Sequence, residues 1–158
     1  MNIFEHAIAL KQEKENFYKE LGESCPNRGV RKLFHILADE EAGHKKSIED
    51  MANNIPSQLA QTHVLEDVKE AFSEIINEPP TTLCGPRQVD LYRKALEYEE
   101  RAEKFYLEKA VQANEPSQQE IFRKIASEET KHKQVLQSVL DIVEKPETWL
   151  ENAEWYHL

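Results

Sequence analysis

Two copies of the pattern Glu-x-x-His occur in the chain, and each could bring an acid and an imidazole to one metal ion. Glu41 and His44 form the first copy, and Glu129 and His132 form the second. Side chains three residues apart on a helix lie on the same face, about one turn apart. A carboxylate oxygen and a neutral imidazole nitrogen can therefore converge there. This mixture of ligands suits iron, manganese or zinc better than calcium or magnesium.

Both copies lie on the apolar face of a predicted helix. Apolar residues flank the first copy at steps of three and four: Val30, Phe34, Leu37, Ile48 and Met51. The second copy is flanked in the same way by Phe122, Ile125, Leu136 and Val139. This spacing is typical of a helix that faces other helices. A carboxylate buried on such a face is usually neutralised, paired or bound to metal, because burying a lone charge is costly.

The two copies belong to an internal repeat. Residues 33–44, LFHILADEEAGH, align without a gap on residues 121–132, IFRKIASEETKH, so positions 88 apart correspond. A single Glu-x-x-His on a Glu-rich helix would more simply be a solvated face or a hydrogen-bonded core histidine. Two copies in register on apolar faces favour a metal site instead.

Prolines, glycines and asparagines divide the chain into helical segments. Long helices are predicted at about residues 3–23, 27–53, 86–114 and 117–144, with a shorter amphipathic helix at 64–76. We therefore predict an all-α fold, a four-helix bundle over residues 1–145 built from two repeated hairpins and a long crossover with a short helix. The aromatic tail, residues 146–158, is expected to pack on the bundle or on a neighbouring subunit. It contains a third Glu-x-x-His, Glu154 with His157.

Composition argues against several other classes of protein. The net charge is −10 and no basic stripe is visible, so a nucleic-acid partner is not expected. No apolar run approaches the roughly 20 residues of a membrane span. The N-terminus carries acids early, unlike a signal or transit peptide. Cys25 and Cys84 lie far apart outside any C-x-x-C pair, so neither a disulfide framework nor a Cys-based metal site is expected, and we predict a cytoplasmic location.

The motifs resemble those of ferritin-like di-iron carboxylate proteins, particularly the rubrerythrin branch, over nearly all of residues 3–143. That family takes one Glu from each of two helices and one Glu-x-x-His from each of the other two. Glu41 with His44 and Glu129 with His132 match the second set. The resemblance implies two metal ions, with iron as the first choice and manganese or zinc as alternatives.

The first set of ligands departs from the family at one position. The family's usual phrase places a ligand Glu four residues after an Ala and seven before a Tyr, and Ala95, Glu99 and Tyr106 match it. In the first helix, Tyr18 matches but the ligand position is Lys11. A protonated lysine has no lone pair to offer a metal.

Two ligand sets therefore remain open. One uses Glu15 and its repeat partner Glu103 symmetrically. The other uses Glu99, with Glu15 or no residue replacing the missing acid. Glu15 could instead form an ion pair with Lys11, one helical turn away.

The resemblance implies a non-haem di-iron oxidoreductase of the peroxidase or ferroxidase type, connected with oxidative stress. Its substrate would be peroxide or O₂. Tyr18 and Tyr106 would be hydrogen-bond partners of the ligands or redox-active phenols, or else buried aromatics with a satisfied hydroxyl. Full rubrerythrins also carry a four-cysteine rubredoxin-like site, which two cysteines cannot build. A separate electron donor such as a rubredoxin, and a homodimer, are thus expected; the alternative is a non-catalytic metal-binding or iron-handling bundle.

Overall fold

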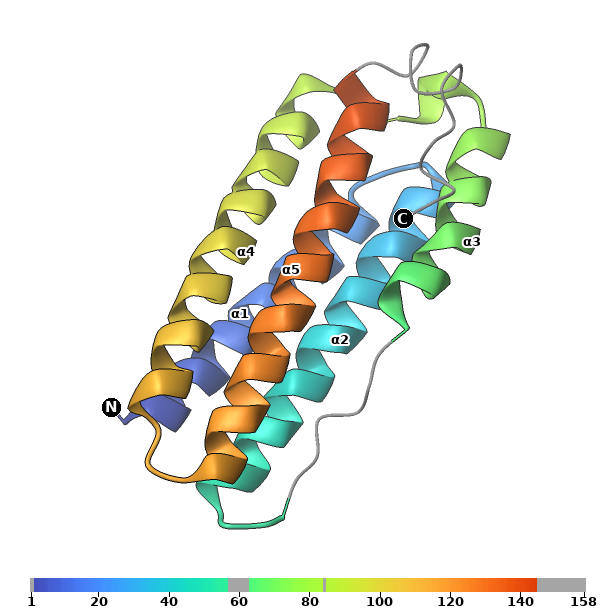
Figure 1. Ribbon diagram of the computed structural model, residues 1–158. Helices are drawn as coiled ribbons and strands as arrows, with labels where there is room; N and C mark the ends of the chain where they lie inside the picture. Colours follow the sequence, from blue (N-terminus) through green and yellow to red (C-terminus); the bar gives the residue numbers. More distant parts are fainter. Residues whose placement is uncertain (1, 57–62, 84, 145–158) are drawn as a thin grey trace.

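The computed structural model describes residues 2–56, 63–83 and 85–144, and their regular structure is helical. The elements are α1 (Ile3–Glu23), α2 (Arg28–Ala52), α3 (Val64–Asn77), the 3-10 turn η1 (Pro80–Thr82), α4 (Pro86–Gln112) and α5 (Pro116–Glu144). The four long helices lie side by side as a bundle, with α3 along α2 (Figure 1). The predicted all-α fold and its helices are confirmed. The aromatic tail, with Glu154 and His157, lies outside the described residues.

Local sequence signals explain where the helices begin. Asn2 caps α1 by accepting a hydrogen bond from the Glu5 backbone N–H at 2.9 Å, and the Glu5 side chain accepts one from the Asn2 N–H. Asn27 caps α2 in the same way, through the Val30 N–H at 3.1 Å. Pro86 and Pro116 open α4 and α5, where the missing N–H costs nothing. The caps and the short connections fix α1 with α2, and α4 with α5, as two helical hairpins.

The crossover helix α3 packs closely on the start of α2 at Gly29. A Cβ atom added to Gly29 would lie nearer than 3.0 Å to the backbone of Ala71 and Ile75, a separation that real Cβ atoms essentially never show. Asn27 adds a hydrogen bond from its side-chain amide to the Ile75 carbonyl, at 3.3 Å. Glycine at position 29 therefore permits the close approach of α2 and α3.

The apolar core is divided into two parts along the bundle. One part includes Phe34 and Leu37 of α2 with Leu136 and Val139 of α5. The other includes Ile48 of α2 with Phe122 and Ile125 of α5. Along both α2 and α5, the Glu-x-x-His motif falls between the residues of the two parts. A polar layer therefore lies across the middle of the bundle, between two apolar regions.

The sequence predicts no disulfide, and Cys25 contradicts that expectation. It is buried and disulfide-bonded, which the spacing of the two cysteines along the chain did not indicate. The reason is general: packing of distant segments, and not separation in sequence, decides which side chains meet. Cys84 lies outside the described residues.

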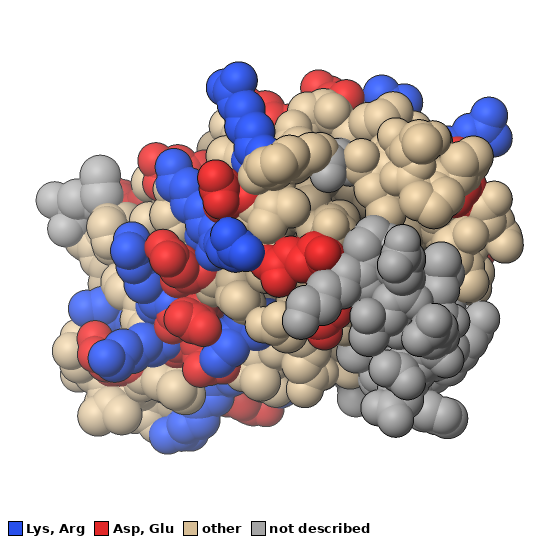
Figure 2. Space-filling model, turned by 90° about the horizontal axis from the view of Figure 1, so that it is seen from above, with Lys and Arg blue, Asp and Glu red and all other residues tan. Residues whose placement is uncertain are grey.

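Positively and negatively charged side chains are mixed on the described part of the surface. At the end of the bundle seen in Figure 2, Lys and Arg side chains are interspersed with Asp and Glu side chains, and they do not form a stripe on the described part of that face. None of the described helices combines the length and apolar character needed to cross a membrane.

Candidate metal centre

Five acid and imidazole side chains meet in the polar layer, and we call them the carboxylate cluster. They are Glu41 and His44 from α2, Glu99 from α4, and Glu129 and His132 from α5, all at most 1 % exposed. All except His44 form a four-donor group, in which one ligand atom from each residue lies within 4.8 Å of the others. Four buried donors at this spacing could hold a metal ion.

Two lysine ammonium groups from α1 lie among the carboxylates. Lys11 Nζ is 2.8 Å from Glu41 Oε2 and also contacts Glu129. Lys14 Nζ is 2.9 Å from Glu99 Oε2 and 3.1 Å from Glu41 Oε1, and it contacts Glu129 as well. Each ammonium group thus bridges at least two of the three acids.

These contacts determine the charge states of the cluster. Burial alone would lower the pKa of Lys11 and of Lys14, but Glu129 and Glu41 raise both pKa values above the usual range. Burial opposes ionisation of Glu41 and Glu129, yet the two lysines hold the pKa of each acid below its usual range. For Glu99, burial and the charge of Glu129 raise the pKa to about 7, despite Lys14. Lys11 and Lys14 are therefore cations, and they neutralise Glu41 and Glu129.

His132 is held between acids on both sides of its ring. Its Nδ1 atom lies 3.3 Å from Glu41 Oε1 and 3.6 Å from Glu99 Oε1, while Nε2 lies 3.2 Å from Glu40 Oε1. Burial would lower the pKa of His132, but Glu99, Glu40 and Glu41 together raise it well above the usual value. Glu40 fixes the ring so that Nδ1 faces the four-donor group.

His44 is in the opposite electrostatic environment. Its Nδ1 atom lies 3.0 Å from Lys11 Nζ, and since an ammonium group can only donate, Nδ1 accepts this hydrogen bond. Burial and the charge of Lys11 lower the pKa of His44. Its ring stacks on the ring of His132, with centroids 6.0 Å apart. The two histidines of the repeat therefore favour different charge states.

Tyr18 and Tyr106 are equivalent in the repeat, and each contacts a residue at the ligand position of the other half. The Tyr18 hydroxyl donates a hydrogen bond to the Glu99 carboxylate, and burial together with that acid raises the pKa of Tyr18 well above its usual value. The equivalent pair in the other half is Tyr106 and Lys11, and Lys11 Nζ lies 5.0 Å from the centre of the Tyr106 ring. Burial raises the pKa of Tyr106 to about 12, although Lys11 opposes the shift. Lys11 thus occupies the position that Glu99 has in the second half.

The alternative ligands Glu15 and Glu103 lie elsewhere. Glu15 forms an ion pair with Lys19, at 2.7 Å. Glu103 accepts a hydrogen bond from Thr130 and lies 3.4 Å from Lys133 Nζ. Of the acids predicted on the first and third long helices, the structure therefore brings Glu99 to the four-donor group, and not Glu15 or Glu103.

Sequence reasoning missed two residues of this site. Lys14 lies one turn after Lys11, but its repeat partner is Ala102, so the repeat gave no indication of its role. Glu40 was not among the predicted site residues, but its side chain is only 13 % exposed and contacts His132. The signal that could have found Lys14 is its helical spacing from Lys11, which places both lysines on one face of α1.

The residues of the cluster fit a metal ion, because several of their buried oxygen and nitrogen atoms have no hydrogen bond among the described residues. Both Glu41 carboxylate oxygens, His44 Nε2 and His132 Nδ1 are buried without a hydrogen-bond partner among the described residues. The Glu41 oxygens are within ion-pair distance of the lysines but not in hydrogen-bond geometry. Buried polar atoms without a hydrogen bond are rare, and a coordinated ion would satisfy them. These four atoms belong to the two Glu-x-x-His motifs, while one further such atom, Gln88 Oε1, lies near the start of α4.

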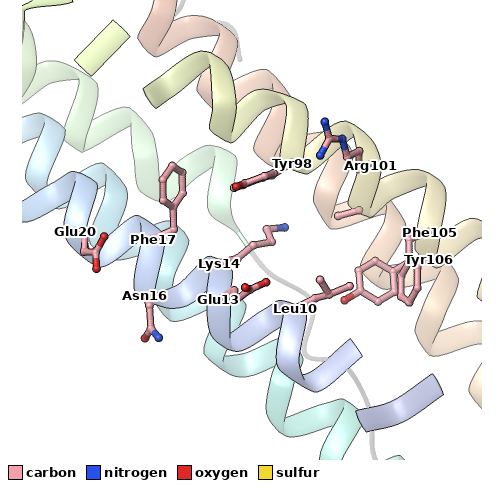
Figure 3. A pocket seen from close by; sticks show the side chains of 11 residues that line it. Leu10, Glu13, Lys14, Asn16, Phe17, Glu20, Tyr98, Arg101, Phe105 and Tyr106 are labelled. Atoms are coloured by element: carbon pink, nitrogen blue, oxygen red, sulfur yellow. The ribbon is translucent and has the colours of Figure 1, made fainter. Parts of the chain in front are cut away.

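A pocket between α1 and α4 reaches the cluster at Lys14. Its volume is about 540 Å³, and its lining includes the aromatic side chains of Phe17, Tyr98, Phe105 and Tyr106. Lys14 projects from α1 into the space between the two helices (Figure 3). Since Lys14 both lines the pocket and contacts the acids, it separates the pocket from the carboxylate cluster.

Comparison with known proteins agrees with the fold. The rubrerythrin family model matches residues 2–140, and it matches again over residues 90–156. No curated protein and no solved structure matches the chain. The first match includes both Glu-x-x-His motifs and nearly the whole bundle. The chain therefore belongs to the rubrerythrin family, whose bundle is ferritin-like.

Proposed function

We propose that the protein binds a transition metal ion, with iron as the first candidate, at the four-donor group. The observation that carries the proposal is the convergence of four buried donors, two of which have ligand atoms without a hydrogen bond. Family membership and the cluster together suggest a two-metal site. In this chain, however, the position beside His44 is bordered by Lys11 where the repeat has an acid. We therefore propose that one ion binds per chain.

The surrounding residues would hold the ligands in place. Bound iron would supply redox chemistry that these side chains lack. Tyr18 fixes the orientation of the Glu99 carboxylate through its hydrogen bond. Glu40 occupies Nε2 of His132 and so leaves Nδ1 for the ion, an arrangement common among metal-bound histidines. The apolar regions on either side of the layer keep bulk water away from the four-donor group.

The test is metal loading of two matched variants. Protein loaded anaerobically with ferrous iron should contain about one ion per chain, with anomalous scattering at the four-donor group. Glu99→Gln should weaken binding by on the order of tenfold to a hundredfold or more, since it removes a charged ligand. Glu103→Gln, on the same helix, should bind as the wild type does.

Two other results would contradict the proposed site. Metal content at background in the wild type would contradict the proposal. Loss of binding in Glu103→Gln, with Glu99→Gln unaffected, would instead support the symmetric ligand set with Glu15.

Oxidation of the bound ferrous ion by peroxide or O₂ is the second candidate. The pocket between α1 and α4 favours it, because a small oxidant in that pocket would be separated from the cluster only by the Lys14 side chain. Each peroxide accepts two electrons and two protons and gives two waters, so with one ion per chain the ferrous ions of two chains become ferric. Repeated turnover would need the separate electron donor. After peroxide is mixed with the loaded protein, a ferric absorption should appear faster than with free ferrous iron. A ferrous signal that persists would remove this candidate and leave metal binding intact.

A further inference from the structure

The lysines of α1 occupy the positions between carboxylates that a metal ion would also need. Lys14 lies within 3.1 Å of Glu41 and Glu99 oxygens and contacts Glu129, all three of which belong to the four-donor group. A buried carboxylate needs a nearby cation, and one cation can replace another. An ammonium group and a metal ion repel each other and compete for the same oxygens. Metal binding therefore requires that Lys14 leave these oxygens.

The two lysines differ in their freedom to move. Lys11 is fully buried, and its ammonium group also contacts His44 and lies over the ring of Tyr106. The Lys14 side chain is 9 % exposed and lines the pocket between α1 and α4. The pocket is also lined by Glu13 and Glu20, whose carboxylates could receive the ammonium group there. The Lys14 side chain could therefore move into the pocket, where Glu13 and Glu20 would provide carboxylates for its ammonium group.

We propose that Lys14 is an exchangeable internal counter-ion of the metal site. Without metal, its ammonium group neutralises the acids of the four-donor group. When an ion binds, the lysine withdraws into the pocket between α1 and α4, so the protein exchanges one cation for another. This inference rests on the proposed metal binding, and it gives the acids of the cluster a cation in both the metal-free and the metal-bound state. Lys11 remains in place in both states.

The test compares two lysine variants of the same helix. Lys14→Met keeps a long apolar stem and removes the charge. Lys19→Met removes a charge from a side chain that is 49 % exposed and that forms an ion pair with Glu15, outside the cluster. Binding of Zn²⁺ is measured by calorimetry, and the stability of the metal-free proteins by urea unfolding. Lys14→Met should bind Zn²⁺ about tenfold to a hundredfold more tightly than the wild type. Its metal-free form should unfold at a lower urea concentration, while Lys19→Met should match the wild type in both measurements.

The outcomes separate this inference from the proposed function. If the wild type binds Zn²⁺ and Lys14→Met binds it no more tightly, the inference is overturned and the proposed function stands. Unchanged urea stability of metal-free Lys14→Met would also overturn it. If neither protein binds Zn²⁺, both the proposed function and the inference fail.

A measurement on the wild type keeps the inference testable even if Lys14→Met does not fold. Crystal structures of the wild-type protein with and without Zn²⁺ should place Lys14 Nζ in the pocket and on the carboxylates, respectively. An ammonium group that stays on Glu99 with the ion bound would overturn the inference.

Discussion

Lys11 and Glu99 occupy equivalent positions in the two halves of the repeat, yet they bring opposite charges to the cluster. The neighbours of the two positions are alike, because Tyr106 lies beside Lys11 and Tyr18 lies beside Glu99. The aliphatic stem of a lysine can cross an apolar region and place its charge among acids. A single change at this position can therefore alter the charge of the site while the packing of the bundle is kept.

Glu40 is expected to act on the metal site only through His132. Glu40→Gln should weaken binding of a divalent ion by about tenfold to a hundredfold, as is usual for partners of metal ligands. The reason is that a neutral amide stabilises the orientation of the ring less than a carboxylate does. Calorimetry with Zn²⁺ measures the change. Asp39→Asn, at an exposed neighbouring position, is the control and should bind normally. Equal binding by Glu40→Gln and the wild type would show that the 3.2 Å contact does not matter.

The helices themselves were predictable because their signals are local. Asn2 and Asn27 cap α1 and α2, and Pro86 and Pro116 open α4 and α5, so the predicted bounds agree closely with the observed ones. The repeat also favoured a metal site built from the two Glu-x-x-His motifs, and Glu41, Glu129 and His132 do meet in the four-donor group. By contrast, the positions of the Lys14 ammonium group and the Glu40 carboxylate depend on how long, flexible side chains reach across helices. The helical spacing of Lys11 and Lys14 places both on one face of α1, but it does not say which groups on other helices their ammonium groups reach.

The close contact between α2 and α3 gives a prediction at the scale of elements. Gly29→Ala should lower the free energy of unfolding by about 1–3 kcal/mol, because the added methyl group must push α3 away from α2. Gly43→Ala is the matched control on the same helix, where an added Cβ meets nothing within 4 Å. That substitution should stabilise the helix by roughly 0.5–1 kcal/mol. Urea unfolding measures both values. Similar stability changes in the two variants would mean that α2 and α3 do not approach closely at Gly29.

The net charge of the whole molecule and the charge of the carboxylate cluster are set by different residues. The chain carries a net charge of −10, and acids are mixed with lysines and arginines on the face seen in Figure 2. In the middle of the bundle, three acids are accompanied by two ammonium groups from α1 and by His132, whose pKa is raised. The charge of the cluster is thus compensated by residues of this same chain, and not by solvent.

This internal compensation predicts that the bundle stays folded after its metal is removed. Small domains whose buried ligands lack another partner unfold when a chelator takes the ion. Here, Lys11 and Lys14 remain available to the acids. Treatment with a chelator should therefore leave the helical signal in far-ultraviolet circular dichroism intact, with a cooperative urea transition. The metal itself should add only its binding free energy, about 2.7 kcal/mol at a free concentration one hundred times the dissociation constant.

The double variant Lys11→Met/Lys14→Met provides the contrast. Its three acids lose both ammonium groups, so the chelated protein should lose stability strongly and recover it when Zn²⁺ is added. If the chelated wild type unfolds as readily as the chelated double variant, the lysines do not stabilise the metal-free state. If both proteins remain equally stable without metal, the acids are neutralised by uptake of protons, and the lysines are dispensable for folding. The predicted order, with the chelated wild type clearly more stable, requires that the two ammonium groups take the place of metal in holding the centre of the bundle together.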